Sequence, residues 1–248
     1  AIQKNLVLTA AHCIPEDVTW DAEFSVGENT TKPDQVVSWK QYALTNYNST
    51  TLRHDIVLFQ TDADFNLKKF PMLADAKPAA GITAGTAGWG RTDPDVNEIA
   101  VHLLETNVTV QKDEVCEIFA EWNQFYQICT YAEDTGACQG DSGGPLFTIT
   151  DCCYYPGVIQ YGITSYTKNP CAENPTVYTS IDKYRDWMNN AIVNFGVANE
   201  INNPVCCKCD NSPNDIGSTS CAADPSPTPT PSPSTFDPVP PPTSFDPV

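Results

Sequence analysis

Short apolar stretches rich in Val, Ile, Thr and aromatic residues recur along residues 1–195, and turn-forming residues separate them. β-Branched and aromatic residues bounded by Gly, Pro, Asn and Asp are typical of short strands. Many such strands with irregular loops predict an antiparallel all-β architecture, either a barrel or a sandwich. The predicted strands are Asn5–Thr9, Asp55–Gln60, Val101–Gln111, Gly144–Ile149, Val158–Tyr166 and Thr176–Ser180.

The period of the pattern changes near residue 180. Apolar side chains in Ser180–Phe195 lie three or four positions apart, which is the spacing of one helix face. They are Ile181, Tyr184, Trp187, Met188 and Ile192. We therefore expect an amphipathic helix that closes the domain, with Gly196 as its stop.

The composition shifts after this helix. Residues 196–224 contain four cysteines, and in residues 225–248 ten of 24 residues are proline, mixed with Ser and Thr. A segment of that kind buries too little to offset its ordering entropy, so we expect a disordered, extended linker. A tether to a further module and an O-glycosylated spacer both remain open for it.

Charge and cysteine content restrict the class of protein. The 248-residue chain has a net charge of −18, which argues against partners that are nucleic acids or anionic membranes, because phosphate contacts need Lys and Arg. Eleven cysteines with only two methionines indicate disulfides and an oxidising compartment. The glycosylation acceptors Asn29, Asn48 and Asn107 agree with secretion. The chain opens at Ala1 with neither an initiator Met nor a signal peptide, so we expect it to start inside a longer precursor.

One segment places a serine on a glycine-rich turn. In GDSGGP, residues 140–145, the Ser142 hydroxyl can stand open, and the N–H groups of Gly140 and Ser142 can converge on a developing negative charge. A serine hydroxyl needs a base to take its proton, and the base needs a third group to orient it. His12 in LTAAHC is the candidate base, and Asp55 in HDIVLF is the candidate carboxylate.

With these three motifs in this order, the chain resembles the trypsin-like (chymotrypsin-family) serine proteases. The resemblance covers residues 1–195 and implies two antiparallel six-stranded β-barrels with a C-terminal helix. His54 and His102 match no motif position and are expected on the surface or in strands. Further matching segments are Gly88–Gly90, Ile163–Tyr166, Pro175–Thr179 and Tyr184–Ile192.

The resemblance implies a secreted serine endopeptidase that acts on protein or peptide substrates. Ser142 would be the nucleophile, His12 the general base and acid, and Asp55 the residue that orients His12. Ser165 would donate a hydrogen bond to Asp55, and the amides of Gly140 and Ser142 would form the oxyanion hole. No metal or cofactor is expected. The protein would be a monomer, with protein inhibitors as further partners.

The same resemblance places the primary substrate pocket at Gly136, Thr167 and Thr176. No Asp stands at Gly136 to pair with a substrate Arg or Lys, and an unpaired buried guanidinium would cost several kcal/mol. The two β-branched threonines would narrow the pocket. We therefore expect an elastase-like preference for small or medium apolar residues. Lys168 is either a solvated loop residue or a group that favours an acidic substrate side chain.

Family members pair the residue at Asp141 with an N-terminal amine that zymogen cleavage releases, and the family's first strands have no counterpart in this sequence. We therefore expect residues 1–248 alone to be inactive. The resemblance also implies the disulfides Cys116–Cys129 and Cys138–Cys171, and a partner for Cys13 before residue 1. The pairing of Cys152, Cys153, Cys206, Cys207, Cys209 and Cys221 stays open. Disulfides are favoured there over a zinc site, because the spacing lacks a paired C-x₂-C pattern.

The alternative from another class is a catalytically inactive protease homologue that acts as a binding or inhibitory module. Such proteins often lack one residue of the triad. His12, Asp55 and Ser142 are all present in this chain, which favours the enzyme.

Overall fold

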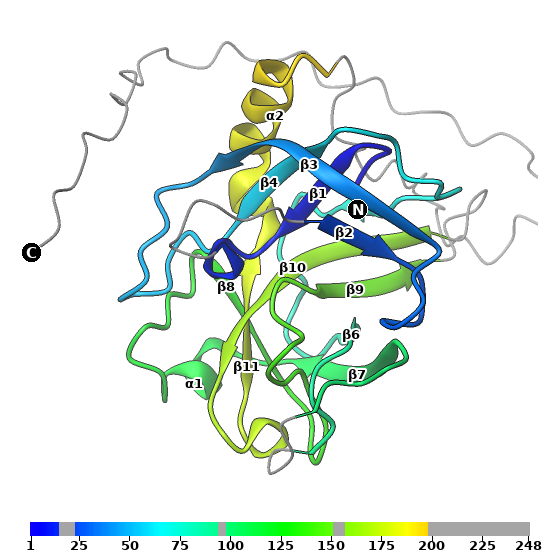
Figure 1. The fold of residues 1–248 in the computed structure, drawn as a ribbon. Coiled ribbons are helices and arrows are strands. Elements are labelled where there is room, and N and C mark those ends of the chain that lie inside the picture. Colours follow the sequence, from blue (N-terminus) through cyan, green and yellow to red (C-terminus); the bar gives the residue numbers. More distant parts are fainter. Residues whose placement is uncertain (15–22, 94–97, 151–156, 198–248) are drawn as a thin grey trace, which may run out of the picture. The chain divides into compact units, whose positions relative to one another are not determined.

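The computed structural model describes residues 1–14, 23–93, 98–150 and 157–197. Its main body contains two β-sheets and one long C-terminal helix (Figure 1). The linker and the six cysteines of open pairing lie outside the described residues. No helix in the described ranges is long and apolar enough to cross a membrane.

The first sheet has four antiparallel strands in the order β1-β4-β3-β2. In this order they are Leu6–Thr9, Val57–Thr61, Gln35–Leu44 and Glu23–Val26. Strand β4 is central in this sheet, paired with β1 on one side and β3 on the other, and it is buried along its whole length. Among the described strands, β1 and β2 remain as the two edges, so this sheet is open.

The second sheet closes into a six-stranded barrel in the order β11-β8-β7-β6-β9-β10, and pairing of β10 with β11 completes the ring. Its strands are β6 (Thr83–Gly88), β7 (Leu104–Val110), β8 (Gln127–Tyr131), β9 (Pro145–Thr150), β10 (Gly157–Thr167) and β11 (Thr176–Ser180). The short strand β5 (Met72–Leu73) pairs with β10 in parallel. The register of β10 shifts next to Tyr161 and next to Ser165. These shifts let the long strand bend, so that it pairs with β9 along one part and with β11 along another.

The fold expectation is confirmed in class: the protein is all-β, with a closed six-stranded barrel, a half-barrel sheet and a C-terminal helix. One detail differs from two complete barrels. The described residues supply four strands to the first sheet, so only the second barrel closes.

The C-terminal helix begins later than the sequence pattern predicts. Ile181–Tyr184 form a 3₁₀ turn (η3), and the α-helix α2 spans Arg185–Asn194. It ends as expected, because Gly196 has φ +74° and donates to Val193 O while Val197 donates to Ile192 O. This pair of bonds is a Schellman motif, and glycine accepts its left-handed backbone without strain. The other short elements are η1 (Ala11–Cys13), α1 (Asp113–Cys116) and η2 (Cys171–Glu173).

One hydrophobic cluster joins the two sheets and the helix. Leu8 and Leu58 come from the first sheet, Ile163 from β10, and Met188 and Ile192 from α2, and all are buried. Burial of each large aliphatic side chain contributes about 1.5–3 kcal/mol, so this cluster fixes how the sheets pack. The same packing brings the start of β4 next to β10.

Candidate active site

His12 and Asp55 meet although 43 positions separate them in the sequence. His12 lies in η1, which follows β1, and Asp55 lies two residues before β4, the strand paired with β1. The His12 Nδ1 atom is 2.7 Å from Asp55 Oδ2, and the His12 backbone N–H donates to Asp55 Oδ1 at 2.8 Å. Both oxygens of the carboxylate therefore hold the same histidine.

Ser165 supplies a third hydrogen bond to this carboxylate. Its Oγ donates to Asp55 Oδ2 at 2.5 Å across 110 positions of sequence. The register of β10 against β11 shifts between Thr164 and Tyr166, so Ser165 is an extra, unpaired residue of the strand. A bulge of this kind re-aims one side chain, and here it aims the hydroxyl at Asp55. Asp55 is fully buried, and its partners balance the cost of burying the charge.

This environment changes the acid–base behaviour of His12. The hydrogen bond to Asp55 is the largest of the causes that raise the pKa of His12 above its ordinary value, with a smaller contribution from Cys13. The His12 side chain is 27% exposed, so its far edge still reaches the solvent side of the site. The pair is therefore a base whose protonated form is stabilised.

Ser142 stands exposed on a turn that two glycines make possible. Gly140 has φ +99° and Gly143 has φ +80°, conformations that other residues rarely adopt. A Cβ on Gly143 would collide with Thr9 Oγ1, at the end of β1. The missing side chain thus lets the serine turn dock beside the segment that leads to His12. The hydrogen bonds among the described residues include none between Ser142 and His12.

The peptide N–H groups of this turn divide into two sets. Those of Asp141, Gly143 and Gly144 donate to Cys138 O, Thr164 O and Asp141 O. In the described part of the chain, the amides of Gly140 and Ser142 donate to no protein acceptor. Two unpaired donors beside a serine hydroxyl are the arrangement that an oxyanion requires.

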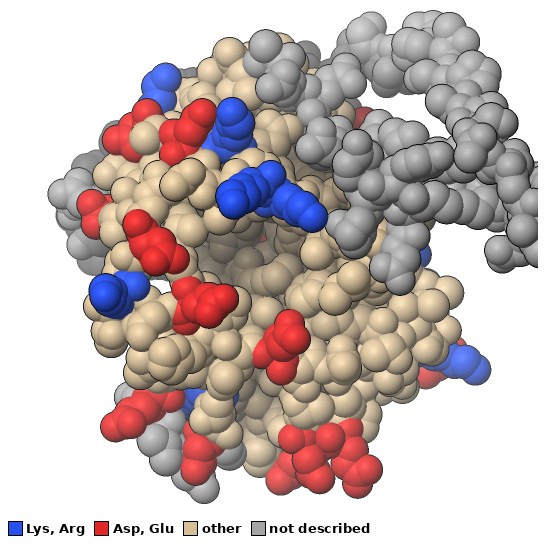
Figure 2. Space-filling model, turned by 90° about the vertical axis from the view of Figure 1, so that its right-hand side faces the viewer, with Lys and Arg blue, Asp and Glu red and all other residues tan. Residues whose placement is uncertain are grey.

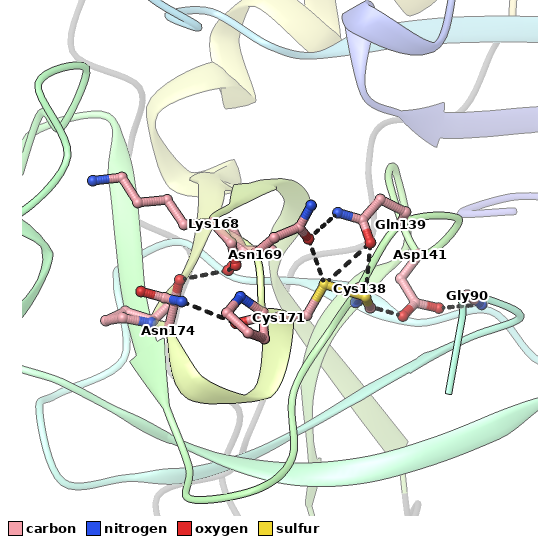
Figure 3. Close-up of a disulfide and its surroundings, with 11 residues drawn as sticks. Gly90, Cys138, Gln139, Asp141, Lys168, Asn169, Cys171 and Asn174 are labelled. Atoms are coloured by element: carbon pink, nitrogen blue, oxygen red, sulfur yellow. Dashed lines mark hydrogen bonds between the residues drawn. A yellow bond between two sulfur atoms is a disulfide. The ribbon is translucent and has the colours of Figure 1, made fainter. Parts of the chain in front are cut away.

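The Asp141 carboxylate lies between Cys138 and Gly90, as Figure 3 shows. It accepts the N–H groups of Gly90 at 2.7 Å and of Cys138 at 2.9 Å. A Cβ on Gly88 or on Gly90 would collide with this carboxylate, so glycine at both positions lets Asp141 keep its place. A cavity of about 430 Å³ adjoins the carboxylate, and its lining includes Gly136, Arg91 and Glu173.

The three residues expected in the substrate pocket also gather. Thr167 and Thr176 are partners across β10 and β11, so their side chains lie on the same face. A Cβ on Gly136 would be 3.7 Å from Thr176 Oγ1. Lys168 does not point at them: its Nζ donates to Ile118 O at 2.9 Å and lies 5.0 Å from the Phe119 ring centre. The adjacent disulfide Cys138–Cys171 forms as expected, and so does Cys116–Cys129.

His54 lies beside the site, although it matches no motif in the sequence. It is half-buried, and its ring packs against Tyr126 and Tyr184 directly beside Asp55. No local signal marks it, because its partners come from distant segments. His102, in contrast, is exposed, as expected. Across the described residues, no group of His, Cys, Asp and Glu is arranged to hold a metal ion.

Comparison with known proteins gives one family. The family model described as Trypsin matches residues 1–188. A chymase of Cavia porcellus is 34% identical over 202 residues, covering 77% of this chain and 76% of the relative. A chymotrypsin of Phaedon cochleariae is 30% identical, covering 75% of this chain and 68% of the relative.

A solved structure agrees with these relatives. Neuropsin, a serine protease expressed in the limbic system of mouse brain, aligns with a TM-score of 0.65 and 26% identity. The alignment covers 77% of this chain and 86% of neuropsin. The strand order, the motifs and these matches together show that the chain belongs to the trypsin family and is a serine endopeptidase.

Proposed function

We propose that Ser142, His12 and Asp55 form the catalytic triad of this endopeptidase. The carrying observation is the buried Asp55 carboxylate, 2.7 Å from His12 Nδ1 and bonded to Ser165. Ser142 Oγ attacks the scissile carbonyl while His12 takes its proton, then gives that proton to the leaving amine. Water hydrolyses the acyl-enzyme by the same route. Asp55 keeps Nε2 of His12 unprotonated toward Ser142.

The amides of Gly140 and Ser142 bind the oxyanion in this proposal. Their lack of an acceptor within the described residues supports it, since donors already committed to the protein could not serve. Removal of one such donor in related chemistry costs about 10²–10³ in rate. Glycine at 140 is needed for the backbone conformation that leaves its N–H free.

The acid side of the pH profile tests the histidine. Protonated His12 cannot accept the Ser142 proton, and Asp55 stabilises the protonated form. We therefore expect kcat/KM to fall as the pH drops through a pKa above 6.5, the ordinary histidine value. The measurement is kcat/KM of the full-length activated protein against pH, with a peptide amide substrate. A midpoint below 6.5 would contradict this environment for His12.

The proposed substrate preference rests on the primary substrate pocket. Gly136, Thr167 and Thr176 would form it, and the two threonine side chains would make it narrow. Thr167 Oγ1 is fixed by a hydrogen bond to Pro175 O, and Thr176 is 2% exposed, so neither side chain swings aside easily. We propose a preference for small or medium apolar residues before the scissile bond. A rat chymotrypsin-like elastase among the relatives, 26% identical, is consistent with this assignment. Lys168 is engaged elsewhere, which favours its interpretation as a loop residue.

A panel of peptide amides with Ala, Val, Leu, Phe, Arg or Glu before the scissile bond tests the pocket. We expect the small and medium apolar residues to lead in kcat/KM. The double variant Thr167→Gly/Thr176→Gly should raise kcat/KM for Phe relative to Ala by about 10–100-fold. The removed side chains enlarge the pocket, and methylene-sized changes in a pocket alter specificity by about this much. Lys168→Ala is the matched control and should leave the ranking unchanged. Dominant cleavage after Arg by the unmodified protein would overturn the pocket assignment.

Activation is proposed to run through Asp141. Its two backbone hydrogen bonds place a carboxylate at the edge of a cavity of about 430 Å³, where an N-terminal amine released by cleavage could pair with it. Asp141 is half-buried, and an ion pair with this amine would hold its carboxylate and thereby stabilise the oxyanion turn. This assignment makes the protein a zymogen before cleavage.

Secretion as a monomeric glycoprotein completes the proposal. The two disulfides, the further cysteines and the acceptors Asn48 and Asn107 support it. Asn29 is half-buried and its Oδ1 accepts hydrogen bonds from Thr31, so its side chain is less accessible to glycosylation than those of Asn48 and Asn107, which are exposed. The face shown in Figure 2 carries scattered acidic side chains and a few basic ones beside its hollow. The net charge of −18 favours protein or peptide partners over nucleic acid.

A further inference from the structure

The chain around Asp55 makes an unusually tight turn. Ile56 N–H donates to His54 O at 2.8 Å, which is a γ-turn centred on Asp55. Leu52 and His54 both have positive φ, at 50° and 58°. Non-glycine residues seldom adopt this conformation, and it persists where the surroundings hold it. The position of the Asp55 backbone therefore depends on what grips this turn.

Two groups grip the turn at His54. Thr45 Oγ1 lies 2.5 Å from His54 O and 3.1 Å from Ile56 O, and its single proton is shared between these two carbonyl oxygens. Thr45 thus holds the backbone of the turn from the side of the first sheet. The His54 side chain reaches in the other direction: its Nδ1 is 3.2 Å from Tyr184 Oη. Its ring also stands edge-on to Tyr126, with 4.8 Å between ring centres.

Tyr184 is a firm anchor. It ends the η3 turn, is 5% exposed, and belongs to the cluster that contains Ile163 of β10. The same strand carries Ser165, which holds the Asp55 carboxylate. Residues from the C-terminal part of the chain therefore hold Asp55 in two ways. Ser165 bonds to its carboxylate, and Tyr184 bonds to the preceding residue, His54.

The charges around this contact favour a neutral pair. Burial, and then the charge of Arg53, lower the pKa of His54. Burial raises the pKa of Tyr184, with smaller contributions from Tyr126, Asp55 and Asp182. A neutral imidazole and a protonated hydroxyl share the hydrogen bond without adding a positive charge beside Asp55. The negative charge of Asp55 remains available to His12.

We propose that His54 and Tyr184 form a clamp that positions Asp55 for its hydrogen bond to His12, so that His54 is a positioning residue of the active site. The proposal rests on the triad proposed above. Ser165 and His12 fix the carboxylate oxygens, whereas the clamp fixes the turn that carries them. Misplacement of a catalytic group by about 1 Å can cost 10²-fold in rate, so a loosened turn should be visible in catalysis.

Tyr184→Phe tests the clamp, because it removes one hydroxyl and keeps the ring. In the full-length activated protein we expect kcat to fall about fivefold, as the loss of one hydrogen bond implies, with little change in KM. The low-field NMR signal of the His12 Nδ1 proton should shift, and the acid limb of kcat/KM should move to lower pH, because a weaker bond to Asp55 lowers the pKa of His12. A structural defect alone would change neither of these last two readouts.

Tyr126→Phe is the matched control. Its ring contacts His54, but within the described residues its hydroxyl has no hydrogen-bond partner, so all three readouts should match the unmodified protein. His54→Asn places an amide atom where Nδ1 lies and tolerates positive φ, so it should rescue the clamp. His54→Gly suits the backbone but lacks the side chain, and should behave like Tyr184→Phe. If Tyr184→Phe does not fold, the comparison of His54→Asn with His54→Gly tests the clamp in its place.

A phosphonate probe of Ser142 separates the two levels of the proposal. Labelling of the unmodified protein, together with an unchanged kcat, NMR signal and acid limb in Tyr184→Phe, would overturn the clamp alone. Absence of labelling in the activated, unmodified protein would overturn the triad and the clamp together. Labelling with all three readouts changed in Tyr184→Phe and His54→Gly supports the clamp.

Discussion

Ser142→Ala should lower kcat for a peptide amide by about 10⁶-fold, since loss of the nucleophile in a serine triad costs about as much as loss of all three members. Ser142 is exposed, and no hydrogen bond in the described residues involves its side chain, so the variant should unfold at the temperature of the unmodified protein. The measurements are kcat, thermal unfolding and labelling by a phosphonate probe.

Ser25→Ala is a suitable control for this variant. Ser25 is an exposed serine of β2, away from the site, and its loss should leave kcat and labelling unchanged. Retention of more than a tenth of the activity by Ser142→Ala, with intact labelling, would show that another residue is the nucleophile.

Asp55→Asn should lower kcat by about 10⁴-fold. An amide NH₂ in place of Oδ2 would donate toward His12 Nδ1 and select the tautomer that carries its proton on Nε2, which cannot accept the Ser142 proton. An NH₂ in place of Oδ1 would face the His12 backbone N–H and lose that bond. The acid limb of kcat/KM should also move to lower pH, because the charge that raises the pKa of His12 is gone.

Steady-state kinetics over a range of pH measure both effects in the activated protein. Asp62→Asn, at an exposed aspartate just after β4, removes the same charge outside the site and should leave kcat and the acid limb unchanged. A loss of less than tenfold in Asp55→Asn would mean that Asp55 does not control the tautomer of His12.

Strands rich in β-branched and aromatic residues were predictable from the sequence. Thr176–Ser180 matches β11 at both ends, and Val158–Tyr166 lies within β10. Strand β6 was missed because its sequence, TAGTAG, is made of small residues without an apolar pattern. Its neighbours make it a strand: Gly85 leaves room for Phe147, and β7 and β9 supply the hydrogen bonds. Packing against neighbours overrides local preference in such cases.

The start of the helix shows the same limit. Ile181 and Tyr184 have helical spacing, but Tyr184 has φ −118° and ψ 9°, so the chain winds as a 3₁₀ turn before α2 begins. Tyr184 faces His54, 130 positions away, and that contact has no trace in the spacing of apolar residues. His54 was therefore expected only as a surface or strand residue.

The amino-acid sequence by itself determined the chemical groups of the site and the backbone that presents them, because glycines at 140 and 143 and the short motifs around His12 and Asp55 act locally. Only the tertiary structure decided which groups meet. The hydrogen bonds of Asp55 to His12 and Ser165, and of His54 to Tyr184, span 43, 110 and 130 positions. Such contacts depend on how two sheets pack over a shared core, and side-chain packing sets that arrangement rather than any local pattern.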